Sequence, residues 1–244
     1  SLGGAMWGVI PAAGRGSRME EHHVDGCKEL IEIGGRSMLL RTVDELVAAG
    51  VTGITVVTSP EKPAIAEALA DFDAADLEFV EQSEPEGIVD ALRKAREVVG
   101  DEMLVASPDN LFIGHPCPSA ELLAAHRITG KTVIGAVQVK SSWGELLSDT
   151  GRIDALNHGG AGELLITGIC EKQKDQPFPM DGENWRCTGR MLITSRFWEE
   201  PESDDVQMLD SLAAVGELVA APIAAAYIDI GLPEGLAYAN SRIN

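Results

Sequence analysis

The stretch WGVIPAAGRGSRMEEHHVDGCKELIEIGGRSML, residues 7–39, carries the strongest local signal in the chain. An apolar, strand-like start is followed by small residues and by cations, namely Ala13, Gly14, Gly16, Arg15, Arg18 and Lys28. Glycine lets a ligand approach the backbone closely, and backbone N–H groups beside arginine side chains suit phosphate oxygens. The stretch therefore predicts a phosphate-binding loop after the first strand. A tight strand-to-helix turn with solvated arginines is the alternative, because such glycine spacing is a weak signal by itself.

A regular alternation of strands and helices continues outward from this first strand. We expect strands at residues 7–12, 54–59, 77–82, 102–106 and 131–140. Helices are expected between them, at residues 37–50, 61–72, 87–100 and 119–130. Such alternation is typical of an α/β fold with a Rossmann-like, doubly wound and mainly parallel sheet.

The pattern changes after about residue 140. Short strands separated by turns are expected at residues 151–156, 163–172 and 186–194, and we interpret them as a small antiparallel insert or flap. A helix at 206–219, a strand at 222–231 and a helix at 233–243 then complete the expected fold.

The composition is that of a globular domain. The chain has 244 residues, of which 45% are hydrophobic and 24% charged, enough to build a full core. No apolar run reaches the length of a membrane span, so we expect no membrane partner. The four cysteines form no CxxC pair, which favours reduced thiols and a cytoplasmic location. We expect a single domain over residues 1–244, with residues 1–6 a frayed or non-native start.

The chain is strongly acidic, with a formal net charge of −20. Nucleic-acid binding needs a basic face that neutralises phosphates, and the sequence shows none, so we expect no nucleic-acid partner. A small anionic substrate can bind only where local cations overcome the overall negative field. The cations of residues 7–39 are therefore of particular interest. The sequence leaves a homo-oligomer open.

Two aspartates far apart in the sequence each follow a strand-like run. Asp109 follows MLVAS, and Asp229 lies in YIDIG. If both strands are parallel, both carboxylates lie at the carboxyl edge of one sheet, where ligands bind in such folds. Mg²⁺ typically takes one or two carboxylates together with substrate phosphates. The alternatives are an Asx turn at Asp109 and a helix N-cap role near Asp229.

Six segments of the chain, in order, resemble motifs of the sugar-1-phosphate nucleotidyltransferases. The segments are PAAGRGSRM with the later Lys28, EQSEPEGIVDAL, SPDNLFIG, GICEKQK, TGRMLIT and YIDIGLPEGLAYAN. Within that family the chain is most similar to the glucose-1-phosphate thymidylyltransferases and uridylyltransferases. The resemblance implies transfer of a nucleoside monophosphate from an NTP (dTTP, UTP or CTP) to a sugar 1-phosphate, with release of pyrophosphate and with Mg²⁺ as cofactor.

The resemblance also assigns roles to individual residues. Catalysis falls to Arg18, Lys28 and Asp109. Nucleotide binding falls to Ala13, Gly14, Arg15, Gly16, Ser17, Gln82 and Gly87, with Gln82 and Gly87 at the base. Sugar-phosphate binding falls to Gly144, Glu171 and Lys172, and Mg²⁺ binding to Asp109 and Asp229.

The chain departs from the family pattern at Cys27, Pro108 and Leu232, where proline, glycine and threonine are usual. Two alternatives therefore stay open. The first is the same chemistry on another phosphate, such as phosphocholine or a polyol phosphate. The second is a non-catalytic module that binds nucleotide sugars. Retention of both acids and of the cations Arg18, Lys28 and Lys172 favours a catalyst.

Overall fold

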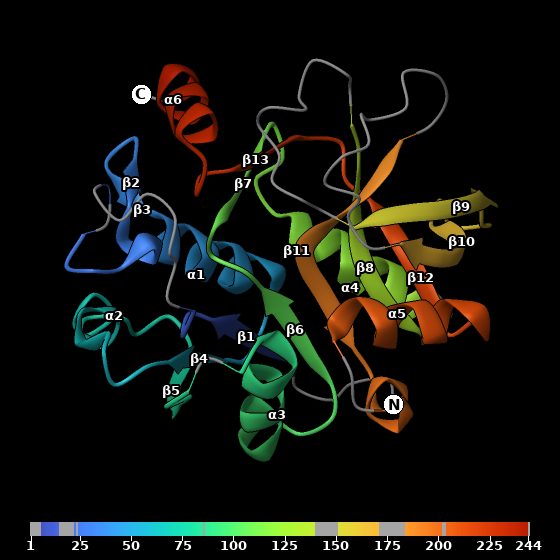
Figure 1. Ribbon diagram of the computed structural model, residues 1–244, viewed down its shortest axis with the longest axis horizontal. Helices are drawn as coiled ribbons and strands as arrows, with labels where there is room; N and C mark the ends of the chain where they lie inside the picture. Colours follow the sequence, from blue (N-terminus) through green and yellow to red (C-terminus); the bar gives the residue numbers. More distant parts are fainter. Residues whose placement is uncertain are drawn as a thin grey trace.

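The computed structural model describes residues 6–14, 22, 24–84, 86–139, 151–170, 184–201 and 204–243. A nine-stranded sheet forms its centre (Figure 1). In sheet order the strands are β5 (Asp76–Glu81), β4 (Gly53–Thr58), β1 (Trp7–Pro11), β6 (Met103–Ala106), β11 (Trp185–Ile193), β8 (Thr132–Gln138), β12 (Leu218–Pro222), β10 (Leu164–Cys170) and β9 (Arg152–His158).

The first half of the sheet is parallel and doubly wound. β5, β4, β1 and β6 pair in parallel with one another. The helices α1 (Met38–Ala49), α2 (Pro63–Glu67) and α3 (Ile88–Val99) alternate with these strands along the chain. The α/β class and the mainly parallel first half predicted from the sequence are thus confirmed.

The antiparallel strands expected after about residue 140 are part of the main sheet. β11 lies between β6 and β8 and is antiparallel to both. β10 and β9 are antiparallel strands at the far edge, while β12 runs parallel to β8. The buried residues Met191, Leu192 and Ile193 explain the central place of β11, because a strand covered on both faces is apolar at successive positions.

Helices cover both faces of the sheet. The neighbours Ile10 and Val9 on β1 belong to different hydrophobic cores, as the alternation of a strand requires. One core contains buried side chains of α1, α2 and α4 (Pro118–Thr129), and the other those of α3 and α5 (Asp205–Ala214). The α1 helix has the expected caps, with the Ser37 hydroxyl accepting from the Leu40 N–H and Gly50 in the left-handed region at its end.

The region after residue 205 differs from the expectation. The helix expected over residues 206–219 ends at Ala214, because Gly216 adopts a positive φ of 74° and breaks it. Residues 218–222 then form β12, which the sequence reading missed. The next strand, β13 (Ala226–Asp229), is shorter than expected and is followed by α6 (Pro233–Arg242).

Two small ladders lie beside the main sheet. β13 pairs antiparallel with β7 (Asn110–Ile113), and the two strands lie side by side in Figure 1. β2 (Glu32–Ile33) and β3 (Arg36–Ser37) form a short hairpin after the 3₁₀ helix η2 (Lys28–Leu30). A second 3₁₀ helix, η4 (Ser195–Glu199), follows β11.

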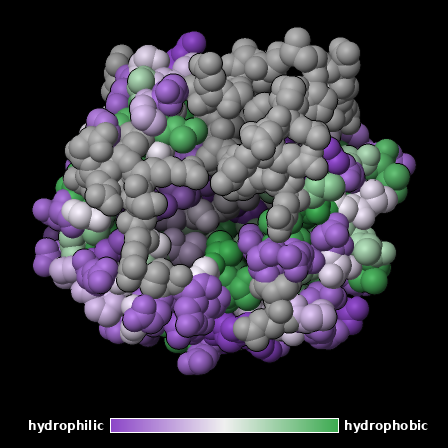
Figure 2. Space-filling model, in the orientation of Figure 1, coloured by the Kyte–Doolittle hydropathy of each residue, from purple (hydrophilic) through white to green (hydrophobic). Residues whose placement is uncertain are grey.

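Among the coloured residues of the face shown in Figure 2, hydrophilic residues predominate, with smaller apolar areas between them. Among the described residues, no helix has both the length and the apolar character needed to cross a bilayer.

Candidate active site

A pocket of about 250 Å³ opens at the carboxyl edge of the parallel strands. It is lined by residues that follow β1, β5 and β6 and by the start of α3. Six residues assigned from the sequence line it: Ala13, Gly14, Lys28, Gln82, Gly87 and Asp109. The pocket therefore lies where open α/β sheets bind their ligands.

The glycine loop enters this pocket directly from β1. The Ala12 N–H donates to the Val57 carbonyl at 2.7 Å, which fixes the start of the loop on the neighbouring strand β4. A Cβ placed on Gly14 would meet no atom within 4 Å, and its φ is not positive. Nothing in the described protein requires glycine there, and Gly14 lines the pocket with bare backbone.

A buried lysine that sequence reasoning missed holds this loop in place. The Lys62 Nζ donates to the carbonyls of Ala12 at 3.0 Å and Gly14 at 2.6 Å. It also donates to both carboxylate oxygens of Glu29, at 2.9 and 3.0 Å. Glu29 is the neighbour of Lys28, so one ion pair ties the loop to the η2 turn. Lys62 precedes a proline after β4, and no local pattern marks it as more than a surface lysine.

Lys28 and Asp109 form an ion pair at the pocket wall. The Lys28 Nζ lies 3.1 Å from the Asp109 Oδ2, and the side chains are 25% and 34% exposed. Burial opposes the charge on Lys28, but Asp109, together with Glu29 and Asp229, outweighs it and raises the pKa of Lys28 above its usual value. Lys28 is therefore a protonated cation at neutral pH, paired with Asp109.

The strand that carries Asp229 differs from the one predicted from the sequence. Asp229 does not end a strand of the main sheet; it ends β13, in the separate ladder with β7. In that ladder Asp229 pairs with Asn110, and the Ile230 N–H donates to the Asp109 carbonyl at 3.2 Å. The two aspartates are thus neighbours through antiparallel pairing rather than through a shared sheet edge.

Tight packing fixes the position of Asp229. Its Oδ1 accepts from the Gly231 N–H at 2.8 Å, and the residue is 9% exposed. A Cβ on Gly235 would lie 1.9 Å from the Asp229 carbonyl oxygen, so α6 begins directly against the end of β13. Leu232, one of the family departures, is the N-cap of α6 and offers no side-chain cap.

Gln82 and Gly87 meet at the opposite wall. The Gln82 Nε2 donates to the Gly87 carbonyl at 3.1 Å and to Asp90 Oδ2 at 2.8 Å. Gly87 has a φ of 96°, which favours glycine, and it is the N-cap of α3 without a side-chain cap. The start of α3 lines the pocket at Gly87 and Ile88 and has no side-chain cap, and such helix N-termini suit anions.

Several assigned residues lie outside the described part of the chain. They are Arg15, Gly16, Ser17, Arg18, Gly144, Glu171 and Lys172. Their roles remain predictions from the sequence. Within the described ranges, no group of three or more His, Cys, Asp or Glu side chains is placed to hold a metal ion.

Comparisons with known proteins show which sequences and which fold the chain resembles. A glucose-1-phosphate thymidylyltransferase of Mycolicibacterium smegmatis is 30% identical over 113 residues, which cover 45% of this chain and only 39% of the relative. A UTP–glucose-1-phosphate uridylyltransferase of Staphylococcus saprophyticus is 25% identical over 234 residues, covering 84% of this chain and 78% of the relative. The UDP-glucose pyrophosphorylase of Acinetobacter baumannii shares the fold, with a TM-score of 0.80 at 20% identity over 97% of this chain and 92% of that one.

The match to a protein family is more extensive. The sequence model of the MobA-like NTP transferase domain matches residues 8–163, which include the glycine loop, Lys28, Gln82 and Asp109. The resemblance read from the motifs is thereby confirmed. Because the match covers more than half of the chain, the chain belongs to the family of MobA-like NTP transferase domains and is a nucleotidyltransferase.

Proposed function

We propose that this chain transfers a nucleoside monophosphate from an NTP to a sugar 1-phosphate, giving an NDP-sugar and pyrophosphate. The observation that carries the proposal is the Lys28–Asp109 ion pair in a pocket whose other walls are the bare backbone at Gly14 and the Gln82 amide. A cation and a bare backbone loop for the phosphates, together with a polar side chain for the base, are what the binding of a nucleoside triphosphate requires. The names of the relatives support the same reaction class.

The base is assigned to the wall formed by Gln82. Its amide nitrogen is already engaged by Gly87 and Asp90, so the carbonyl Oε1 is the atom that remains to meet a base. Uracil and thymine can donate to such an oxygen from N3–H, and cytosine from its 4-amino group, so this atom alone does not separate the three bases. The names of the relatives, which are thymidylyl- and uridylyltransferases, favour UTP or dTTP over CTP.

The chemistry consists mainly of alignment and charge stabilisation. An oxygen of the acceptor phosphate attacks the α-phosphorus, and the bond from that phosphorus to the bridging oxygen breaks as pyrophosphate leaves. Lys28 holds a non-bridging oxygen of the α-phosphate and stabilises the charge that develops there. Arg18 is proposed to hold the pyrophosphate, and Gly144, Glu171 and Lys172 the acceptor, as the motifs imply.

The two aspartates fit a divalent cation. Asp109 lies at the pocket wall beside Lys28, and the pairing of Asp229 with Asn110 brings the second aspartate next to the Asp109 turn. Two carboxylates together with substrate phosphates are a usual Mg²⁺ donor set. When bound, Mg²⁺ would neutralise phosphate charge and orient the phosphate oxygens.

A pyrophosphate-release assay tests the proposal. UTP, dTTP and CTP are each combined with glucose 1-phosphate, other sugar 1-phosphates and phosphocholine in the presence of Mg²⁺. We expect release with UTP or dTTP and a sugar 1-phosphate. Lys28→Ala should lose pyrophosphate release. Lys131→Ala, which changes a lysine just before β8 at the amino end of that strand, should retain it. No release from any combination would refute the proposed reaction, and equal release by Lys28→Ala and the wild type would refute the role of Lys28 in it.

One observation favours a second class of acceptor. A further pocket of about 490 Å³ lies beyond the carboxyl ends of β8 and β12, and its described lining is mainly apolar, with Trp185, Ile113 and Ala226 beside Gln138. An aromatic and apolar wall suits a quaternary ammonium group better than a ring of hydroxyls. Phosphocholine is therefore the second candidate, and faster release with it than with any sugar 1-phosphate would select it.

A further inference from the structure

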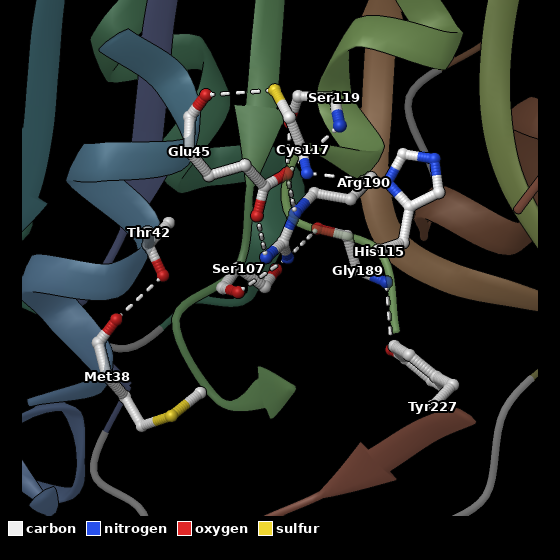
Figure 3. Close-up of polar contacts among 10 residues, drawn as sticks. All are labelled: Met38, Thr42, Glu45, Ser107, His115, Cys117, Ser119, Gly189, Arg190 and Tyr227. Carbon is white, nitrogen blue, oxygen red and sulfur yellow. Dashed lines mark hydrogen bonds and ion pairs between the residues drawn. The ribbon is translucent and has the colours of Figure 1, made fainter. Parts of the chain in front are cut away.

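A buried ion pair behind the pocket has no part in the chemistry proposed above. Glu45 on α1 and Arg190 on β11 are joined by two bonds, from Arg190 Nε to Oε1 at 2.8 Å and from Nη2 to Oε2 at 2.7 Å (Figure 3). Their side chains are only 7% and 2% exposed. The backbone N–H and the hydroxyl of Ser119 also donate to Glu45.

Both members of this pair are ionised despite their burial. Burial opposes both charges, but each partner outweighs it, so the pKa of Glu45 lies below its usual value and that of Arg190 above. Buried ion pairs contribute little net stability compared with apolar residues of the same size, because desolvation offsets the attraction. The position of the guanidinium therefore calls for an explanation other than stability.

The third guanidinium nitrogen of Arg190, Nη1, contacts the turn that carries Asp109. Its Nη1 donates to the carbonyls of Ser107 at 2.8 Å and Gly189 at 3.2 Å. The Ser107 N–H in turn donates to the Gly189 carbonyl at 2.8 Å. Ser107 lies two residues before Asp109, so both backbone groups of Ser107 are tied to β11.

Gly189, the neighbour of Arg190 on β11, contacts the strand that carries Asp229. The Gly189 N–H donates to the Tyr227 hydroxyl at 2.9 Å, and Tyr227 lies two residues before Asp229 on β13 (Figure 3). The Tyr227 ring is fully buried and packs against Phe112 of β7, with ring centroids 4.9 Å apart. The Arg190 guanidinium carbon lies 4.9 Å from the centre of that Phe112 ring.

Close packing makes this connection rigid. A Cβ on Gly189 would lie 2.6 Å from the Asn110 Oδ1 and 2.9 Å from the Ser107 Cβ. β11 therefore contacts the turn at residues 107–110 directly, and no larger residue fits between them.

We propose that Arg190 and Tyr227 are positioning residues, which set the separation of the Asp109 and Asp229 carboxylates from behind. Arg190 fixes the Asp109 turn through Ser107, Tyr227 fixes β13 through Gly189, and Glu45 fixes Arg190. This inference rests on the proposed function, in which the two aspartates bind the divalent cation. Partners that orient metal ligands in this way commonly contribute about 10–100-fold to metal affinity.

Binding of Mn²⁺ alone, measured by electron paramagnetic resonance of the free ion, tests the inference. Asp109→Asn should abolish the site, and Arg190→Lys and Tyr227→Phe should each weaken it about tenfold. Tyr227→Phe removes one hydroxyl and serves if Arg190→Lys does not fold. Thr132→Val is the matched control: it removes a buried hydroxyl that bonds Thr194 at the opposite end of the sheet, and it should leave Mn²⁺ affinity unchanged.

Crystal structures of Arg190→Lys and Tyr227→Phe provide a readout that does not depend on the metal. We expect the Asp109 or Asp229 carboxylate to be displaced from its wild-type position. Wild-type Mn²⁺ affinity in folded variants with unmoved aspartates would overturn the inference. If Asp109→Asn binds Mn²⁺ as the wild type does, the proposed metal site is wrong. The crystal structures then decide alone: displaced aspartates support the positioning role, and unmoved aspartates overturn it.

Discussion

The Nζ of Lys28 rests 3.1 Å from the Oδ2 of Asp109, so the cation proposed to meet the α-phosphate is already paired with a carboxylate proposed to bind Mg²⁺. Both side chains are partly exposed, and such a pair is worth little free energy in water. The pair can therefore open at small cost when substrate arrives. The contact holds the two groups at the pocket wall in the free protein, near the positions proposed for them in the reaction.

Replacing Lys28 should affect turnover more than folding. In Lys28→Met we expect kcat to fall about 10²–10³-fold, because a charged donor to the developing phosphate charge is lost. Pyrophosphate release under saturating substrate measures this. Lys131→Met, treated in the same way, should retain wild-type kcat. A Lys28→Met variant within twofold of the wild type would remove Lys28 from the catalytic assignment.

Gly14→Ala should separate ligand binding from stability. The added Cβ meets no atom of the described protein within 4 Å, so the free energy of unfolding should stay near wild type or rise by about 0.4–1 kcal/mol. The same Cβ should obstruct the triphosphate and raise the NTP Kd about tenfold. Urea unfolding and calorimetric titration with UTP measure the two effects. Gly160→Ala, also unobstructed but not among the residues that line the pocket, should leave the NTP Kd unchanged and show a similarly small effect on stability.

The Lys62–Glu29 pair offers a test of loop anchoring. Lys62→Met should destabilise the fold by about 3–5 kcal/mol, because it leaves Glu29 buried without its partner. The double variant Lys62→Met/Glu29→Met should recover most of that loss. NTP affinity should stay low in both, since the carbonyls of Ala12 and Gly14 have lost their donor. Recovery of NTP affinity in the double variant would show that Lys62 only neutralises Glu29.

Gly235→Ala should damage the end of β13. The new Cβ would lie 1.9 Å from the Asp229 carbonyl oxygen, so α6 must shift. We expect a loss of about 1–3 kcal/mol in the free energy of unfolding, as for overpacked cores. Gly160→Ala again provides the unstrained comparison in the same urea experiment. Equal stability of the two variants would mean that α6 moves away freely.

The Glu45–Arg190 pair predicts a dependence of stability on acid. The pKa of Glu45 is lowered from 4.5 in the folded state, so its stabilising effect is complete above pH 4.5 and is lost as the pH falls through the folded-state value. Between pH 6 and pH 3, the wild type should therefore lose more stability than the double variant Glu45→Met/Arg190→Met. Urea unfolding at the two pH values, on either side of the isoelectric point near 4.5, measures the difference. Equal losses would show that other carboxylates dominate the acid response.

The parallel half of the fold could be predicted from the sequence because its signals are local. Apolar runs such as residues 103–106, and the cap residues Ser37 and Gly50, mark their elements without help from distant parts of the chain. The place of β11 could not be predicted in this way. Its neighbours β6 and β8 are set by pairing across long sequence separations, and an antiparallel strand in the middle of a parallel sheet has no sequence signature of its own.

The residues of the candidate site that belong to family motifs could be predicted from the sequence. The buried residues that hold them in place could not. Lys28, Gln82, Gly87 and Asp109 were found because their motifs appear in family order, and the structure brings them to one pocket. Lys62, Glu45 and Arg190 were missed, because a buried charge is recognisable only once its partner is known, and these partners lie far away in the sequence. For the same reason the approach of Asp229 through β13 was misread.

The ladder of β7 and β13 has a consequence for synthesis of the protein. A nascent chain that has left the ribosome as far as residue 222 carries Lys28, Gln82, Asp109 and both β11 and β12, yet it lacks Asp229. The second carboxylate reaches the site only when residues 226–229 pair with residues 110–113, more than a hundred positions back. The second carboxylate of the proposed cation site is therefore placed after the rest of the pocket, so on the proposed function an incompletely translated chain lacks a complete site for the divalent cation.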